Sequence, residues 1–168
     1  MDFHAGDRVV YGSMGVCMFE GTEKRIFDGI GEKEYCKLVP ADGSSAAYYV
    51  PADSADGKIR PLLTRDQVYA LIDEMPDIEP MTCENSHEWK AKVSAVMQSG
   101  SYENMISVIK AINGRRRSGK KLNFSDERTM KNAKRAILGE FSVILGMTES
   151  QTDRFICDRL GVGCEAAV

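Results

Sequence analysis

The chain has 168 residues, of which 43% are hydrophobic and 28% are charged, a balance typical of globular proteins and opposed to wholesale disorder. No apolar run reaches about 18 residues, and no basic segment precedes an apolar one near the start, which argues against a membrane span and a secretion signal. We therefore expect a cytoplasmic protein without a membrane partner. The cysteines are odd in number and include no Cys-x-x-Cys pair, which favours reduced, structural thiols over disulfides or a zinc site. They are Cys17, Cys36, Cys83, Cys157 and Cys164.

The net charge of −3 conceals a strong segregation of charge along the chain. Residues 1–88 hold 8 Lys and Arg against 17 Asp and Glu, residues 89–135 hold 12 against 3, and residues 136–168 hold 2 against 5. A basic block inside an acidic chain is typical of a surface that binds a polyanion such as nucleic acid. The ordinary alternative for a run of charge is a solvated surface.

The first 63 residues have the pattern of short strands separated by turns. Val9–Tyr11 and Val16–Phe19 flank a reversal bracketed by Gly12 and Gly15, which predicts a hairpin. The second strand continues to Ile26. Further strands are expected at residues 33–39, 46–50 and 59–63. Strands at this spacing predict a small antiparallel β-barrel of the SH3-like or Tudor-like kind over residues 1–63, a fold that binds partners more often than it catalyses reactions.

From residue 64 onward the apolar spacing becomes helical, which predicts an all-helical bundle of about five helices over residues 64–168. Capping boxes at Thr64–Gln67 and Thr148–Gln151 begin the first and last helices. Three more helices are expected to begin at Ser86, Ser101 and Ser125 and to end at Gly100, Asn113-Gly114 and Gly146. The expected fold class is α+β with two domains.

Five motifs in the first 63 residues occur in the order and spacing of a known domain. They are Phe3, Gly6–Tyr11, Gly15-Val16, Glu34–Leu38 and Val50–Ala52. Together they resemble the RNA-polymerase-interaction domain of CarD-like transcription regulators, which also occurs in transcription-repair coupling factors. Gly12 stands where that family usually has proline, which relaxes the turn without removing it. A barrel followed by helices also resembles the CarD-like proteins, to about residue 150.

The resemblance implies that the barrel docks on the β subunit of bacterial RNA polymerase. The residues expected at this contact are Arg25, Ile26, Tyr49, Val50 and Pro51. Arg25 matches a basic residue typical of the family's second strand, whereas Tyr49 occupies a position that is usually basic. Tyrosine offers apolar area and one hydroxyl in place of a charged group, so affinity for polymerase is expected to differ. Without the resemblance, Arg25 is an ordinary surface arginine.

Trp89 is the sole tryptophan, and its helical phase with Val93 and Val96 favours core packing. The resemblance implies another role, because CarD-like proteins have a tryptophan here that wedges into the minor groove at the upstream edge of the melted promoter. Lys90 and Lys92 follow it, as the family pattern requires. A large apolar ring can hold open an unstacked base step while lysines bind the phosphates. We therefore favour the wedge, although the indole can also rest one edge on the bundle.

Ten basic residues lie between Lys110 and Arg135, more than an ordinary solvated surface requires. The residues expected to bind DNA are Trp89, Lys90, Lys92, Arg115, Arg116, Arg117, Lys120, Lys121, Arg128, Lys131 and Arg135. No pattern resembles a major-groove recognition helix, so contacts to the phosphate backbone that do not depend on base sequence are expected.

No residue pattern indicates catalysis. Gly114–Lys120 fits the start of a phosphate-binding loop, but Lys121 replaces the Ser or Thr that binds Mg²⁺, and a helix precedes the segment. His4 and His87 lack partners at the spacing of a metal site or catalytic triad. We expect no enzyme, no cofactor and no metal.

The sequence thus predicts a monomeric transcription regulator, associated with the nucleoid through RNA polymerase. It would stabilise the promoter open complex through DNA contacts and the Trp89 wedge. The alternative is a non-catalytic interaction module whose helical domain binds nucleic acid generally, without a role in promoter opening.

Overall fold

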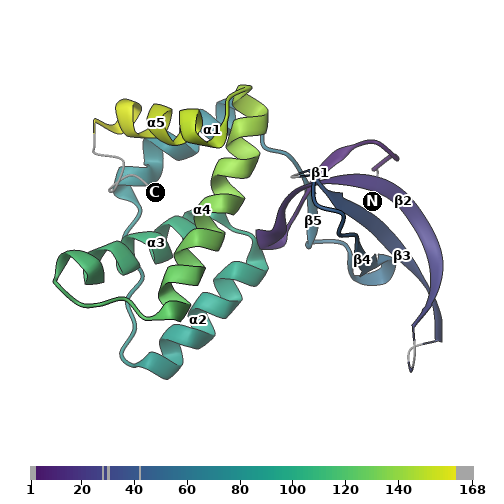
Figure 1. Cartoon of the computed structure of the whole chain (residues 1–168), viewed down its shortest axis with the longest axis horizontal. Helices are drawn as coiled ribbons and strands as arrows, with labels where there is room; N and C mark the ends of the chain where they lie inside the picture. Colours follow the sequence, from purple (N-terminus) through teal and green to yellow (C-terminus); the bar gives the residue numbers. More distant parts are fainter. Residues whose placement is uncertain (1–2, 28, 30, 42, 162–168) are drawn as a thin grey trace. The chain divides into compact units, whose positions relative to one another are not determined.

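In a computed structural model, the chain divides into two compact units, Met1–Leu62 and Leu63–Val168. The first contains the strands and the second contains the helices (Figure 1). The structure describes residues 3–27, 29, 31–41 and 43–161. Cys164 and parts of the turns predicted at residues 28–31 and 42–45 therefore lie outside the described residues.

The first unit is a five-stranded antiparallel sheet with the strand order β4-β3-β2-β1-β5. Its strands are β1 (Arg8–Tyr11), β2 (Gly15–Phe27), β3 (Gly31–Pro40), β4 (Tyr48–Pro51) and β5 (Ile59–Pro61). The predicted hairpin is confirmed, because β1 pairs with β2 across the short 3-10 turn η1 (Gly12–Met14), with Tyr11 opposite Gly15. β2 and β3 run side by side as a long curved ribbon (Figure 1).

The sheet is open rather than closed into the predicted barrel. β4 and β5 are its two edges, and no pairing joins them within the part of the chain that the structure describes. One face carries the core of the unit, where Cys17, Leu38 and Val50 pack together with Val9 and Ile59. β2 bends at a bulge between Phe19 and Gly21, as an extra residue in one strand requires.

The second unit contains five helices within the described residues, as predicted. They are α1 (Arg65–Glu74), α2 (Ser86–Ser99), α3 (Tyr102–Arg117), α4 (Phe124–Leu145) and α5 (Glu149–Leu160), with a short 3-10 turn, η3 (Met75–Asp77), after α1. Both predicted capping boxes are present, at Thr64 and Thr148. Gly100 and Gly146 end α2 and α4 in the left-handed conformation that glycine adopts without strain.

Three helix boundaries differ from the prediction. α2 is capped by Asn85 instead of Ser86, and α4 is capped by Asn123, so it begins at Phe124. α3 passes through Asn113 and Gly114, where the sequence predicted its end, and stops at Arg117. The basic side chains of its last turn suit the negative end of the helix dipole, which favours this extension.

The helical core is built from the apolar faces of the helices, with Ile106, Ile137 and Phe141 fully buried. Glu140 lies inside it and accepts hydrogen bonds from the Leu63 backbone N–H at 2.6 Å and from the Tyr102 hydroxyl. None of the helices in the described part of the chain is long and apolar enough to cross a membrane.

Candidate functional site

Trp89 is the centre of a polar and aromatic cluster that joins α2, α3 and α4. Its side chain is 6% exposed, and its indole Nε1–H donates to the Asp126 carboxylate at 2.9 Å. The Arg115 guanidinium lies over the indole, 3.7 Å from the ring centroid, and forms an ion pair with the same carboxylate at 3.2 Å. The three side chains therefore hold one another, and Trp89 packs on Val108 and Ile112 behind them.

The cluster borders a surface hollow of about 410 Å³. Trp89, Lys90, Arg115, Lys120 and Lys121 all line it, although they come from α2, α3 and the α3–α4 connection. The structure thus brings together five of the residues predicted to bind DNA. Four positive side chains and two carboxylates, the buried Asp126 and the exposed Glu84, line the hollow, and this excess of positive charge favours an anionic ligand.

The remaining predicted DNA contacts lie outside this hollow. Arg116 and Arg117 are exposed on the last turn of α3, which corrects their predicted place in a connecting loop. Arg128, Lys131 and Arg135 are exposed along α4 at helical spacing.

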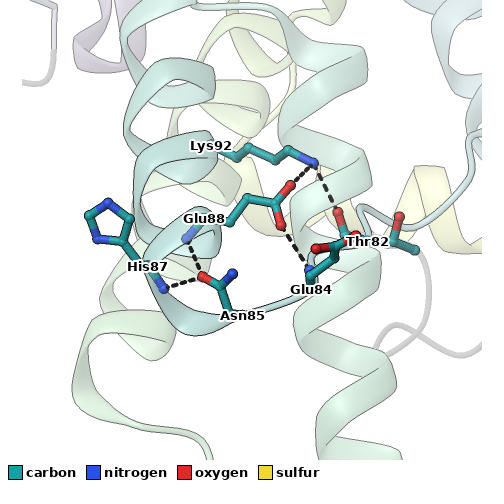
Figure 2. A network of polar contacts seen from close by, with 6 residues as sticks. All are labelled: Thr82, Glu84, Asn85, His87, Glu88 and Lys92. Carbon is teal, nitrogen blue, oxygen red and sulfur yellow. Dashed lines mark hydrogen bonds and ion pairs between the residues drawn. The ribbon is translucent and has the colours of Figure 1, made fainter.

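Lys92 is engaged by neighbouring groups, as Figure 2 shows. Its ammonium pairs with Glu88 at 2.7 Å and donates to the Thr82 carbonyl at 3.2 Å. The ion pair lowers the pKa of Glu88 and raises that of Lys92. With its charge compensated, Lys92 is a weaker candidate for a phosphate than Lys90.

The same network fixes the segment that borders the hollow (Figure 2). The Asn85 side chain accepts from the backbone N–H groups of His87 and Glu88 at 3.1 and 2.9 Å. Glu88 in turn accepts from the backbone N–H of Glu84 at 2.8 Å. These hydrogen bonds before and after Asn85 fix the backbone at the start of α2, the part of the helix that contains Lys90.

A second predicted site lies on the sheet, where Arg25 of β2 meets Tyr49 of β4. The Arg25 guanidinium donates to the Tyr49 hydroxyl at 2.7 Å and lies 4.4 Å from the centre of its ring. Its Nε donates to Glu23 at 2.7 Å, and this bond lowers the pKa of the Glu23 carboxyl. Tyr49 and Glu23 thus orient Arg25 on the surface.

The five predicted polymerase contacts do not share one face of the sheet. The strand register places Arg25, Tyr49 and Pro51 on one face, and Ile26 and Val50 on the other. Ile26 is 74% exposed, but Val50 is 2% exposed and belongs to the core, so its side chain offers no surface to a partner. The Val50 side chain thus anchors the edge strand, and the contact of Val50 with polymerase stays a prediction.

Three residues that contribute to these sites were not predicted as site residues. Asp126 has only the signal of an acid in the first turn of a helix, which the dipole already explains. Glu23 and Phe27 lie on the same face of β2 as Arg25, two residues before and after it. The Phe27 ring packs edge-on against Tyr35 and Tyr49, with ring centroids 5.0 and 6.2 Å apart. Strand alternation could have grouped them, but only the pairing of β3 with β4 brings Tyr49 to them.

Comparison with known families agrees with both halves of this description. Residues 3–63 match the family described as "CarD-like/TRCF RID domain", and residues 68–157 match the one described as "CarD, C-terminal domain". The chain belongs to the CarD family. As a member of this family, the chain is a transcription factor that interacts with RNA polymerase. No curated protein matches it.

The histidine, cysteine and acidic residues are the side chains in which a metal site or a reactive thiol would be found. No group of three or more His, Cys, Asp or Glu residues is placed to hold a metal among the described residues. The side chains of Cys17, Cys36 and Cys157 are buried, and that of Cys83 is half-buried. Burial raises the pKa of the Cys36 thiol, which disfavours the reactive thiolate.

Proposed function

We propose that this CarD-family protein stabilises the promoter open complex while bound to the β subunit of RNA polymerase. The observation that carries the DNA side of the proposal is the hollow that gathers Trp89 with four basic side chains. Its charge suits phosphates and its aromatic border suits an unstacked base edge. No nucleotide hydrolysis is needed, because binding alone shifts the equilibrium between closed and open DNA.

The polymerase side of the proposal rests on the face that carries Arg25. Its guanidinium is exposed, oriented by Tyr49 and Glu23, and suited to a carboxylate on the partner. Tyr49 and Pro51 stand on β4, an edge strand whose outer backbone groups pair with no strand among the described residues. Such an edge can also accept a strand from a partner.

The role of Trp89 in this proposal depends on a rearrangement. Insertion of the indole into a minor groove requires that its Nε1–H leave Asp126 and that Arg115 leave the face of the ring. DNA can favour this change, because phosphates compete with Asp126 for Arg115. A preference of about 1.4 kcal/mol for open over closed DNA is then enough to change their ratio tenfold.

The buried position of Trp89 favours a second candidate, in which the indole is a structural residue under the hollow. The protein would then bind nucleic acid through charge alone and have no effect on promoter opening. The affinity for bubble DNA compared with that for a duplex of equal length separates the two candidates. Only the open-complex proposal predicts that the bubble binds more tightly.

The first test is association of the full chain with core RNA polymerase, comparing the wild type with Arg25→Glu. Lys24→Glu is the matched control, because it reverses an exposed charge on the opposite face of the same strand. We expect Arg25→Glu to abolish binding and Lys24→Glu to retain it. Equal loss in both variants would mean that net charge, not the Arg25 face, drives association.

The second test is the lifetime of open complexes with saturating protein. We expect the wild type to prolong it and Trp89→Ala to remove most of that effect while polymerase binding persists. An undiminished effect of Trp89→Ala would remove the wedge from the proposal.

A further inference from the structure

Phe124 is the most exposed aromatic residue of the helical unit. It is the first residue of α4, and its side chain is 79% exposed. The other aromatic residues of this unit are buried or half-buried: Tyr69, Trp89, Tyr102, Phe141 and Phe155. A single exposed apolar residue is ordinary on a protein surface, so its surroundings must decide whether it has a role.

Most exposed charged residues that share a face of α4 with Phe124 are basic, and Glu127 is the exposed acid of the same turn. Arg128, Lys131 and Arg135 follow Phe124 at offsets of 4, 7 and 11, which is the spacing of one helical face, and all three are exposed. Asp126, Ala133 and other residues out of phase with them are buried. Phe124 therefore lies at the start of a basic stripe on the solvent face of α4, three residues after Lys121 in the chain.

The dimensions of this stripe suit a nucleic acid strand. With a rise of about 1.5 Å per residue, the distance from Phe124 to Arg135 along the helix axis is about 16 Å. Along the axis of a B-form duplex, that length is the rise of about five phosphates of one strand. Surfaces that bind single strands combine cations along the backbone with an aromatic ring on which a base stacks, and this stripe has both components.

We propose that Phe124 stacks on an unpaired base of melted DNA while Arg128, Lys131 and Arg135 contact the adjoining phosphates. This inference rests on the proposed function and adds a base-contacting residue to it. Phe124 requires no rearrangement for this role, whereas Trp89 is held by Asp126 and Arg115. Phe124 thereby gives a preference for unpaired over paired DNA that the cations alone do not supply, since phosphates are present in both.

The test measures binding of the full chain to two labelled DNAs of equal length, a duplex with a central unpaired bubble and a fully paired duplex. We expect Phe124→Ala to weaken bubble binding by about 5- to 100-fold and to change duplex binding less than about twofold. Phe124→Trp should retain the preference for the bubble, because an aromatic face remains. Neither variant should alter the salt dependence, since no charge is lost.

Lys131→Ala is the comparison variant for the charged part of the surface. It should weaken both DNAs similarly and reduce the slope of log affinity against log salt by about 0.7 to 0.9. If Lys131→Ala behaves so and Phe124→Ala leaves bubble binding unchanged, the stacking role is overturned and the proposed function stands. If the wild type binds neither DNA, the proposed DNA contacts themselves are overturned, whatever Phe124 does.

Discussion

Asp126 holds together the residues around which the DNA proposal is built. Its buried carboxylate accepts from Trp89 and pairs with Arg115, so Asp126→Ala leaves the indole N–H without its acceptor. We expect a loss of about 1 to 3 kcal/mol in the free energy of unfolding, measured by urea denaturation. Glu127→Ala removes an exposed acid from the same helical turn and should change stability by less than about 0.5 kcal/mol. Equal losses of stability in Asp126→Ala and Glu127→Ala would show that Asp126 stabilises the fold only through its charge, not through its bonds to Trp89 and Arg115.

Tyr49 offers a prediction for the polymerase-binding face. Tyr49→Phe keeps the ring beside Arg25 but removes the hydroxyl that accepts from its guanidinium. An arginine that is less well oriented loses part of its affinity, so we expect polymerase binding to weaken about two- to tenfold in a titration. Tyr48→Phe, the adjacent residue of β4, is the control and should leave affinity unchanged. A stronger effect at Tyr48 would move the contact to the other face of the strand.

The DNA-binding site could be predicted from the sequence only for residues whose type alone indicates their role. Trp89 and the basic segment stand out by composition, and five of the predicted DNA residues do line one hollow. The Asp126 carboxylate, which accepts from the Trp89 indole, lies 37 positions away along the chain, and no local sequence pattern links the two residues. Long-range pairings of this kind depend on how helices pack, which helical periodicity alone does not specify.

At the scale of elements, helix starts and stops were predicted best at the two capping boxes and at the glycines that end α2 and α4. Both Thr-led capping boxes and the terminal Gly100 and Gly146 were confirmed. The predicted end at Asn113-Gly114 was wrong, because tertiary packing of Asn113 outweighs the helix-breaking tendency of the pair. The barrel was predicted from strand count and spacing, which do not determine whether the edge strands meet.

The contact between α1 and α5 leads to a prediction about pH. Arg159 donates two hydrogen bonds to the Asp73 carboxylate at 2.6 and 2.7 Å, and this lowers the pKa of Asp73 below its ordinary value. A lowered pKa in the folded state stabilises the fold above the ordinary value, and that contribution is lost as the pH falls through the folded pKa. We expect Asp73→Asn to lower the unfolding temperature slightly at pH 7 and to match the wild type in strong acid.

Glu74→Gln is the control for this pH effect, because it removes the next acid of α1, which is exposed. The difference in unfolding temperature between Glu74→Gln and the wild type should not change as the pH falls through the pKa of Asp73. The effect of Asp73 is expected to be small, since both partners of its ion pair face solvent and salt screens them. An Asp73→Asn deficit that persists unchanged in acid would show that the substitution disturbs packing instead of removing an ion pair.

At the scale of the whole molecule, the two units divide the proposed work. A protein held on polymerase by its sheet presents its basic helical surface to nearby DNA at an effective concentration that reaches the millimolar range for short tethers. Weak contacts to phosphates then suffice. Residues 1–62 hold 7 Lys and Arg against 10 Asp and Glu, and this negative charge keeps the sheet unit from competing for DNA. The basic block of residues 89–135 lies entirely within the helical unit, so docking of the sheet unit brings that block close to the promoter.

This division predicts that the two binding activities can be lost separately. Arg25→Glu should abolish polymerase binding and leave affinity for free DNA unchanged, measured by fluorescence anisotropy. A chain carrying Arg116→Gln, Arg117→Gln and Lys131→Gln should bind polymerase normally and lose about 0.9 in the salt slope for each phosphate contact removed. A loss of both activities in either variant would contradict the division.

Combining the substitutions tests the tether itself. Each set alone should shorten open complexes towards the lifetime seen without the protein, because docking and DNA contact are both required. When Arg25→Glu is already present, adding the three DNA substitutions should shorten the lifetime no further at nanomolar protein, since an undocked chain rarely reaches the promoter. Additive losses would mean that the helical unit acts on DNA without polymerase, and the general nucleic-acid-binding candidate would then explain the data better.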